Sequence, residues 1–136
     1  MPKTRTGGPG KSAGLPLSTV KRGVLVTKPY AYSGKRDIEV TIAQPEFTSL
    51  CPMTGLPDFG TVTVVYTPCT RLLELKSLKL YLLQYRQVGA FYEHVINLII
   101  EDLIAVVEPA WMEVRGEFTA RGGITTTVAA RYEEET

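Results

Sequence analysis

The sequence has few residues that bind metals or form cross-links, with two cysteines, Cys51 and Cys69, and one histidine, His94, among 136 residues. Two cysteines cannot build the set of disulfides that holds small secreted domains together. Two cysteines and one distant histidine also make a poor zinc site. We therefore expect both thiols to be free and no metal to be bound.

Long hydrophobic runs are also lacking. The longest apolar segment, residues 95–107, is interrupted by Asn97, Glu101 and Asp102. It is too short to cross a bilayer and is typical of a helix in a protein core. No stretch near the start resembles a secretory signal, so we expect a cytoplasmic protein that does not contact membranes.

Acidic residues are absent before Asp37, whereas lysines and arginines are frequent there. A basic arm of this kind can bind nucleic acid. Residues 1–20 are rich in glycine, proline, serine, threonine and lysine, however, which favours a solvated, disordered tail. We expect such a tail over residues 1–20, one domain over residues 21–136, and no direct contact with nucleic acid.

The pattern of apolar residues predicts two strands, two helices and two further strands. Alternation predicts strands, and the strand at 61–66 ends before Pro68. The helices end near Gly89 and before Pro109, and the last two strands form a hairpin around residues 120–123. The predicted elements are strands at 36–44 and 61–66, helices at 77–87 and 91–107, and strands at 111–119 and 124–132. This order indicates an α+β domain, ββααββ, in which two helices cover one face of an antiparallel sheet.

The segment TSLCPMTGLPDFG, residues 48–60, holds Cys51 and Asp58 in a loop that prolines and glycines stiffen. A free cysteine is commonly a small buried hydrophobe, and an acid such as Asp58 commonly caps a turn. The loop composition, the lack of a helix or strand pattern and the nearby carboxylate favour a reactive thiol at Cys51. Cys69 has none of these features, and we expect it to be structural.

The segment ELKSLKLY, residues 74–81, places one acid and two lysines within eight residues. On a helix, Lys76 and Lys79 share one sector with Arg86 and form a positive stripe. Such stripes are commonly solvated helix faces. Lysines also suit phosphate groups as point charges, so an anionic ligand is the alternative.

Taken together, the two segments resemble those of the 7-cyano-7-deazaguanine reductases, the nitrile reductases of the queuosine pathway of tRNA modification, in their short single-module form. The resemblance covers residues 34–132 without a large gap. It implies the tunnelling fold, whose subunits join edge to edge into rings, and a homo-oligomer with sites at subunit interfaces. The strand order agrees with this fold but does not single it out.

The resemblance implies NADPH-dependent reduction of the nitrile of 7-cyano-7-deazaguanine to a primary amine, 7-aminomethyl-7-deazaguanine. In this reading Cys51 is the nucleophile that forms a covalent thioimide, and Asp58 is the proton donor. A thiolate is well suited to attack a nitrile carbon. The family further implies that the deazaguanine pocket is lined by Leu73, Glu74 and Leu75, at the start of the second segment. It also implies that NADPH is contacted by Lys76, Ser77 and Lys79.

The segment that begins the second predicted helix departs from the family's commoner pattern, which has histidine followed by glutamate. An alignment without gaps puts Tyr92 at the histidine and Glu93 at the glutamate. The Glu93 carboxylate can accept two hydrogen bonds from a guanine-like edge, and Tyr92 can stack on or hydrogen-bond the substrate. His94 lies about 200° around the helix from Tyr92, on the polar face, so we expect it at the surface.

Arg121 lies in a turn that resembles the family's Pro-Arg-Gly-Gly turn, with Ala120 in first place. The sequence does not choose between a phosphate and a neighbouring subunit as its partner. Two other functions remain open. One is a related amidinotransferase that acts on the nitrile in tRNA, which the 74–81 segment disfavours. The other is a non-catalytic pterin- or purine-binding module of the same fold, which would not need Cys51.

Overall fold

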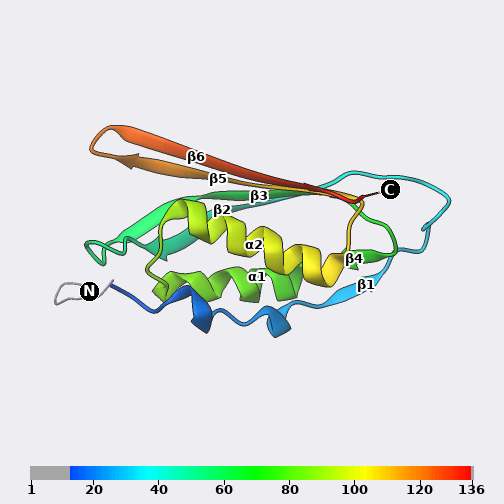
Figure 1. Ribbon diagram of the computed structural model, residues 1–136, viewed down its shortest axis with the longest axis horizontal. Coiled ribbons are helices and arrows are strands. Elements are labelled where there is room, and N and C mark those ends of the chain that lie inside the picture. Colours follow the sequence, from blue (N-terminus) through cyan, green and yellow to red (C-terminus); the bar gives the residue numbers. More distant parts are fainter. Residues whose placement is uncertain (1–12, 136) are drawn as a thin grey trace.

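A computed structural model describes residues 13–135 of the chain (Figure 1). The helices α1 and α2 cover one face of a four-stranded antiparallel sheet of order β2-β3-β5-β6, and β1 pairs with β4 in a separate two-stranded sheet. The predicted α+β architecture is therefore confirmed. The main elements are β1 (Thr27–Pro29), β2 (Val40–Leu50), β3 (Pro57–Thr67), β4 (Arg71–Leu73), α1 (Leu75–Leu83), α2 (Tyr92–Val107), β5 (Trp111–Arg121) and β6 (Ile124–Glu133).

The core lies between the sheet and the two helices, as the alternation in the strands predicts. On β3, Val62, Val64 and Tyr66 are buried, while the residues between them are half-buried on the other face. The helix α2 contributes the apolar stripe that packs on this face, with Val95, Ile96, Ile99 and Leu103. Within residues 13–135, no helix is long and apolar enough to span a membrane.

The first two strands of the main sheet are longer than predicted toward the loop between them. A register shift between Gln44 and Phe47 interrupts the alternation of β2, which then continues to Leu50. Glycine is required at position 60 of β3, because a Cβ there would collide with the main chain of Glu117. The irregular segment predicted over residues 48–60 is therefore wrong in extent, since only residues 51–56 connect the two strands.

The N-terminal segment is part of the folded body from Ala13 onward. The Ala13 N–H donates to the Pro52 carbonyl at 2.8 Å, and the Leu15 N–H donates to the Gln87 carbonyl at 2.6 Å. A side chain at Gly89 would collide with the Ala13 carbonyl oxygen, so only glycine permits this close approach. The tail predicted over residues 1–20 is thus too long, because residues 13–20 pack on the domain. Residues 1–12 lie outside the described part.

Short 3₁₀ helices extend this segment and α1, namely η1 (Leu17–Thr19), η2 (Arg22–Val24) and η3 (Gln84–Gln87). The helix predicted over 77–87 accordingly begins two residues earlier, at Leu75, and changes to η3 after Leu83. Glu74 defines the start, because its carboxylate accepts hydrogen bonds from the N–H groups of Lys76 and Ser77.

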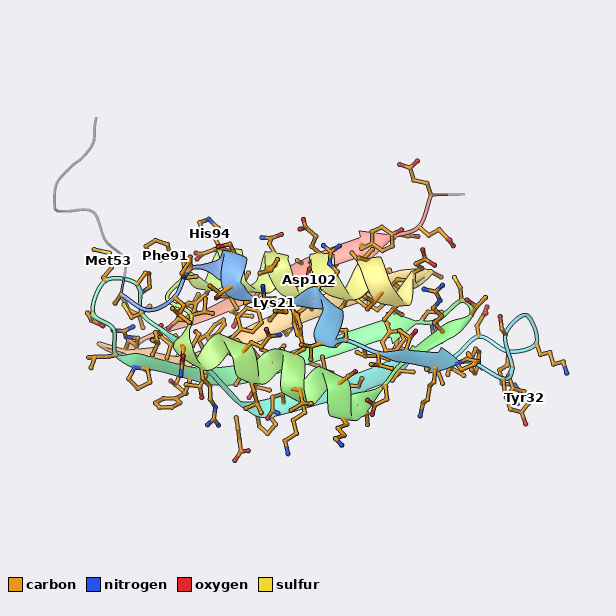
Figure 2. The ribbon with its side chains drawn as sticks, turned by 90° about the horizontal axis from the view of Figure 1, so that it is seen from below. Lys21, Tyr32, Met53, Phe91, His94 and Asp102 are labelled. Carbon is orange, nitrogen blue, oxygen red and sulfur yellow. The ribbon has the colours of Figure 1, made fainter. Side chains whose placement is uncertain are left out.

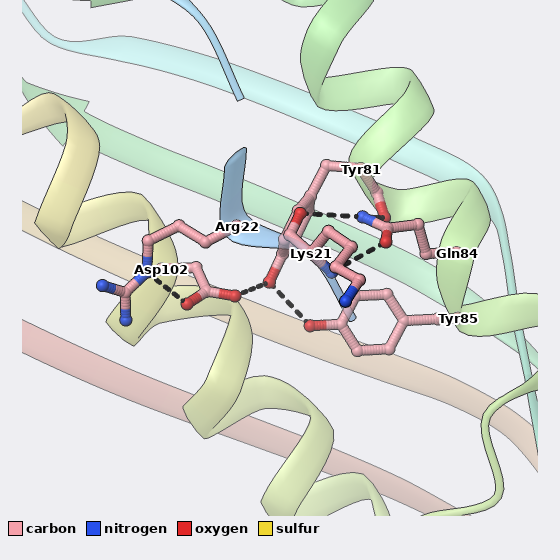
Figure 3. A network of polar contacts seen from close by, with 6 residues as sticks. All are labelled: Lys21, Arg22, Tyr81, Gln84, Tyr85 and Asp102. Atoms are coloured by element: carbon pink, nitrogen blue, oxygen red, sulfur yellow. Dashed lines mark hydrogen bonds and ion pairs between the residues drawn. The ribbon is translucent and has the colours of Figure 1, made fainter. Parts of the chain in front are cut away.

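A buried polar network joins the N-terminal segment to both helices (Figure 3). The Tyr81 hydroxyl donates to Asp102 at 2.6 Å and lies 2.7 Å from the Tyr85 hydroxyl. Arg22 Nε donates to the other oxygen of Asp102 at 2.8 Å. Burial raises the pKa of both tyrosines, so their hydroxyls stay protonated at neutral pH.

Replacement of Asp102 by alanine is expected to lower the free energy of unfolding by about 3 kcal/mol. The substitution leaves the buried Tyr81 hydroxyl and the Arg22 guanidinium without their shared acceptor. Urea unfolding would measure the change. The exposed neighbour provides the control, since Glu101→Ala should change stability by no more than about 0.5 kcal/mol. Equal effects of the two substitutions would contradict the role given to the network.

Candidate active site

The strands β2 and β3 place Cys51 and Asp58 at one end of the sheet. Cys51 directly follows β2, and Asp58 is the second residue of β3, opposite Ser49 in the register. The connection between the strands is held by a hydrogen bond from the Cys51 N–H to the Leu56 carbonyl at 2.9 Å. Asp58 is 4% exposed and lies on a strand, not in the loop that the sequence predicts.

Arg121, at the end of β5, forms an ion pair with Asp58. The distance from Nη1 to Oδ1 is 2.6 Å. The antiparallel register of β3 and β5, in which Gly60 faces Phe118, brings the end of β5 toward Asp58. The guanidinium also lies close enough to the Cys51 thiol and the Tyr92 hydroxyl to affect their pKa values. The sequence leaves the partner of Arg121 open, and within the chain that partner is Asp58.

The environment of Cys51 favours the thiolate. A hydrogen bond from the Thr54 side chain has the largest effect on the pKa of Cys51 and lowers it, while burial acts in the opposite direction. Arg121 lowers it further, and the result is a pKa of about 7. At pH 7 such a thiol is about half ionised, and the thiolate is the nucleophilic form. Burial raises the pKa of Cys69 instead, which leaves that thiol unreactive by comparison.

Four of the predicted site residues share one pocket. The pocket has a volume of about 260 Å³ and lies between the Cys51 turn, the start of α2 and the β5–β6 hairpin. Its lining is made by Cys51, Pro52, Asp58, Ala90, Phe91, Tyr92, Glu93, Arg121 and Thr126. The structure therefore brings together the predicted nucleophile, the predicted acid and the two residues at the start of α2.

Tyr92 lies in this pocket with one ring face already covered. Its ring stacks on Phe118, with centroids 3.8 Å apart and an interplanar angle of 8°. A substrate therefore cannot stack on that face of the ring. The hydroxyl of Tyr92 faces Asp58 and Arg121. Burial, and then the charge of Asp58, raises the pKa of Tyr92, which keeps the hydroxyl a hydrogen-bond donor at neutral pH.

His94 is exposed, and the prediction that it lies at the surface is confirmed. Figure 2 shows it beside Phe91 and Met53 at one end of the molecule, far from Tyr32 at the other. It contacts the edge of the Phe91 ring, at a centroid distance of 6.3 Å. It borders a separate hollow next to the N-terminal segment and does not line the Cys51 pocket.

The predicted residues 73–79 do not line the Cys51 pocket. They lie at the end of β4 and the start of α1, near β1 (Figure 1). Leu73 is buried in the core, and Leu75 is exposed. The Ser77 hydroxyl accepts from the Val26 N–H and donates to the Glu74 carbonyl. The side chains of Leu73 and Ser77 are thus occupied by the fold, so a ligand contact there would have to involve their main chain.

The lysines of this segment fit an anionic ligand better. Lys76 and Lys79 are exposed, and Lys79 borders a shallow hollow beside β2 together with Arg86 and Glu46. Within residues 13–135, none of these three cations has a carboxylate within ion-pair distance. The same part of the chain contains no group of three or more histidine, cysteine or acidic side chains arranged to bind a metal ion.

Comparison with known proteins agrees with the resemblance. The family model described as "QueF-like protein" matches residues 57–136. The NADPH-dependent 7-cyano-7-deazaguanine reductase of Chloroherpeton thalassium is 56% identical over 100 residues, which cover 74% of this chain and 86% of the relative. The chain belongs to the QueF-like protein family.

One further relative and one solved structure are also similar to this chain. The NADPH-dependent 7-cyano-7-deazaguanine reductase of Caldicellulosiruptor bescii is 51% identical over 111 residues, with 82% of this chain and 84% of the relative covered. The crystal structure of the archaeosine synthase QueF-Like in the apo form superposes with a TM-score of 0.63 at 21% identity, covering 74% of this chain and 96% of that chain. At this identity the superposition shows a common fold.

Proposed function

We propose that this protein is an NADPH-dependent nitrile reductase that converts 7-cyano-7-deazaguanine to 7-aminomethyl-7-deazaguanine in queuosine biosynthesis. The observation that carries the proposal is the pocket that unites Cys51, whose pKa is lowered to about 7, with the Asp58–Arg121 ion pair and the Glu93 carboxylate. The names of relatives that are 51–56% identical support the same substrate and cofactor. A free base as substrate needs no contact with nucleic acid and suits a cytoplasmic enzyme.

The first chemical step is the addition of the Cys51 S–H across the nitrile. The sulfur forms a bond to the nitrile carbon, one π bond of the nitrile breaks, and the nitrogen receives a proton. The Asp58 carboxylate lines the pocket together with Cys51, so it can accept the Cys51 proton and pass it to the nitrile nitrogen. The product is a covalent thioimide, and no proton has to come from solvent.

The remaining chemistry adds two hydrides and two protons to the bound group, a reduction by four electrons in which solvent supplies the protons. When bound, two NADPH molecules in turn supply the two hydrides. The lowered pKa of Cys51 also makes this sulfur a good leaving group when the carbon–sulfur bond breaks. Glu93 is exposed at the pocket and can accept two hydrogen bonds from the amino and ring N–H groups of the base, which would orient the nitrile toward Cys51.

The exposed cations of α1 and η3 are the groups that would hold the cofactor phosphates. Because they lie apart from the Cys51 pocket within one chain, the proposal includes a homo-oligomer in which a neighbouring subunit supplies Glu74, Leu75, Lys76 and Lys79. The outer strands β2 and β6 of the described sheet have unpaired edges through which subunits could join. Sedimentation velocity would test this, since a monomer at working concentration would remove the shared site.

The proposed reaction can be tested by two measurements on the same sample. Incubation with 7-cyano-7-deazaguanine should increase the mass of the intact protein by one substrate, and addition of NADPH should then be followed by its oxidation at 340 nm. A mass increase without NADPH oxidation would indicate the amidinotransferase. The absence of a mass increase would indicate a binding module.

Lys79→Ala is expected to raise KM for NADPH about tenfold and to change KM for the nitrile by less than twofold. The lysine offers a point charge to a phosphate and lies outside the Cys51 pocket. Steady-state kinetics with each substrate varied would measure this. Lys35→Ala is the matched control, since that exposed lysine lies in the segment before β2. Unchanged NADPH kinetics in both Lys76→Ala and Lys79→Ala would show that the positive stripe is a solvated helix face that does not contact the cofactor.

Tyr92→Phe is expected to reduce kcat about tenfold, whereas His94→Ala should change it less than threefold. The phenylalanine keeps the stack on Phe118 and removes only the hydroxyl that faces Asp58 and Arg121, and hydrogen bonds to charged groups contribute about 1.5–3 kcal/mol. Rates of NADPH oxidation would measure both. An inactive but folded His94→Ala, with a normal Tyr92→Phe, would reverse the two assignments.

A further inference from the structure

Ser49 has a buried hydroxyl that the proposed reaction does not use. The residue is 0% exposed, and its Oγ is the only buried side-chain nitrogen or oxygen without a hydrogen-bond partner within residues 13–135. Buried polar groups nearly always have a partner in native proteins, and an exception calls for an explanation. Its neighbours in the sheet suggest one.

Ser49 lies directly opposite Asp58 in the pairing of β2 with β3. Opposite residues of an antiparallel pair project from the same face, with Cβ atoms about 5 Å apart. The Asp58 side chain is also buried. A rotation about χ1 of Ser49, between staggered positions, can therefore bring its hydroxyl within hydrogen-bond distance of the Asp58 carboxylate.

Asp58 is held by Arg121, and this arrangement cannot persist when a ligand enters. The guanidinium lines the pocket together with Cys51 and Asp58, so a nitrile held between the nucleophile and the acid would compete with it for space. The Arg121 side chain is 40% exposed and precedes Gly122 and Gly123, so it has room to move outward. Asp58 would then keep the neutral Tyr92 hydroxyl nearby but lose its cation, and a buried carboxylate in that position gains from a further hydrogen-bond donor.

We propose that Ser49 is a positioning residue whose hydroxyl donates to the Asp58 carboxylate once Arg121 has moved out of the space between Cys51 and Asp58. The exchange replaces a cation by a neutral donor. A carboxylate held by a neutral hydroxyl accepts a proton more readily than one paired with guanidinium. Asp58 can then carry the Cys51 proton to the ligand nitrogen, while Ser49 keeps its own proton. The proposal rests on the proposed function only for the identity of the entering ligand.

The test compares Ser49→Ala in two backgrounds, the native chain and Arg121→Gln, by the rate at which iodoacetamide alkylates Cys51 at pH 7. With Arg121 present, Ser49→Ala should change this rate by less than about 1.5-fold, because Arg121 already holds Asp58. Without Arg121, Ser49→Ala should slow alkylation about fivefold, because an uncompensated carboxylate opposes a second negative charge on Cys51. Ser49→Thr, which keeps a hydroxyl, should restore most of the rate.

Urea unfolding is the control for folding, since Ser49→Ala removes an unpaired hydroxyl and should leave the midpoint at or above that of the native chain. In the native background Ser49→Ala should also slow formation of the covalent product with 7-cyano-7-deazaguanine about fivefold. Equal effects of Ser49→Ala on alkylation in both backgrounds, or no effect in either, would overturn the proposal. If the native chain forms no product with the nitrile, the proposed function fails, and the alkylation rates still decide the role of Ser49.

Discussion

Replacement of Cys51 by alanine is expected to abolish both the mass increase with 7-cyano-7-deazaguanine and the oxidation of NADPH. The substitution removes the thiol that lies in the pocket with Asp58 and Glu93. Cys69 is the only other thiol in the chain, and it borders a different hollow, near the start of β4. Intact-protein mass and absorbance at 340 nm would measure both effects.

The matched control is Cys69→Ala, for which turnover should stay within about threefold of the native value. Cys69 is partly buried, and its pKa is raised by burial and by Glu134. It therefore offers little thiolate at neutral pH. A comparable loss of turnover in Cys69→Ala would refute the assignment of the nucleophile.

The lowered pKa of Cys51 also predicts how the rate of alkylation depends on pH. Because the thiolate reacts and the pKa is about 7, alkylation of the free protein should rise with pH, reach half its maximum near pH 7 and level off about one unit above. The hydrogen bond from Thr54 has the largest lowering effect, so Thr54→Val should move this midpoint to higher pH and slow alkylation at pH 7.

Local patterns in the sequence predict the fold well where one face of an element is buried. The alternation of β5 and β6 and the apolar stripe of α2 place these three elements close to their observed bounds. Local patterns do not predict the end of β2 and the start of β3. A register shift after Gln44 and a close approach of neighbouring strands at Gly60 interrupt the alternation there, in a segment rich in proline and glycine. Both features depend on contacts with neighbouring strands.

The same limit applies to the site. Cys51, Asp58, Tyr92 and Glu93 belong to two short motifs, and the sequence identifies them because each motif is read locally. The ion pair of Asp58 with Arg121 joins residues 63 positions apart and depends on the register of β3 with β5. Once the register of β3 with β5 is known, the Pro-Arg-Gly-Gly-like turn indicates that Arg121 lies near Asp58. In the same way, the register of β2 with β3 indicates that Ser49 lies opposite Asp58.

The tyrosine at position 92 is accommodated by the sheet beneath it. Phe118 of β5 provides the surface on which its ring stacks, and the hydroxyl is thereby directed to Asp58 and Arg121. A protonated phenol donates a hydrogen bond but, with its raised pKa, does not titrate near neutral pH as a histidine does. Proton transfer at this site therefore depends on Asp58 and Cys51.

Asp58→Asn is expected to reduce kcat about 10²-fold or more, within the usual range for loss of a general acid or base. The asparagine nearly preserves the shape of the buried side chain, so the turn that carries Cys51 should be retained. Its amide cannot accept the Cys51 proton and deliver it to the nitrile nitrogen, and product formation should slow together with turnover. Single-turnover mass measurements and NADPH oxidation would report the two effects.

The control for this change is Glu117→Gln, which neutralises an exposed acid on β5 and should leave kcat within about twofold. Arg121→Gln separates charge from proton transfer at Asp58. It removes the ion pair and one of the contacts that lower the pKa of Cys51, so it should slow alkylation at pH 7 while leaving the carboxylate able to carry a proton. If Asp58→Asn retained the full rate from pH 6 to 8, Asp58 would have no part in proton transfer, and the Tyr92 hydroxyl would be the remaining donor in the pocket.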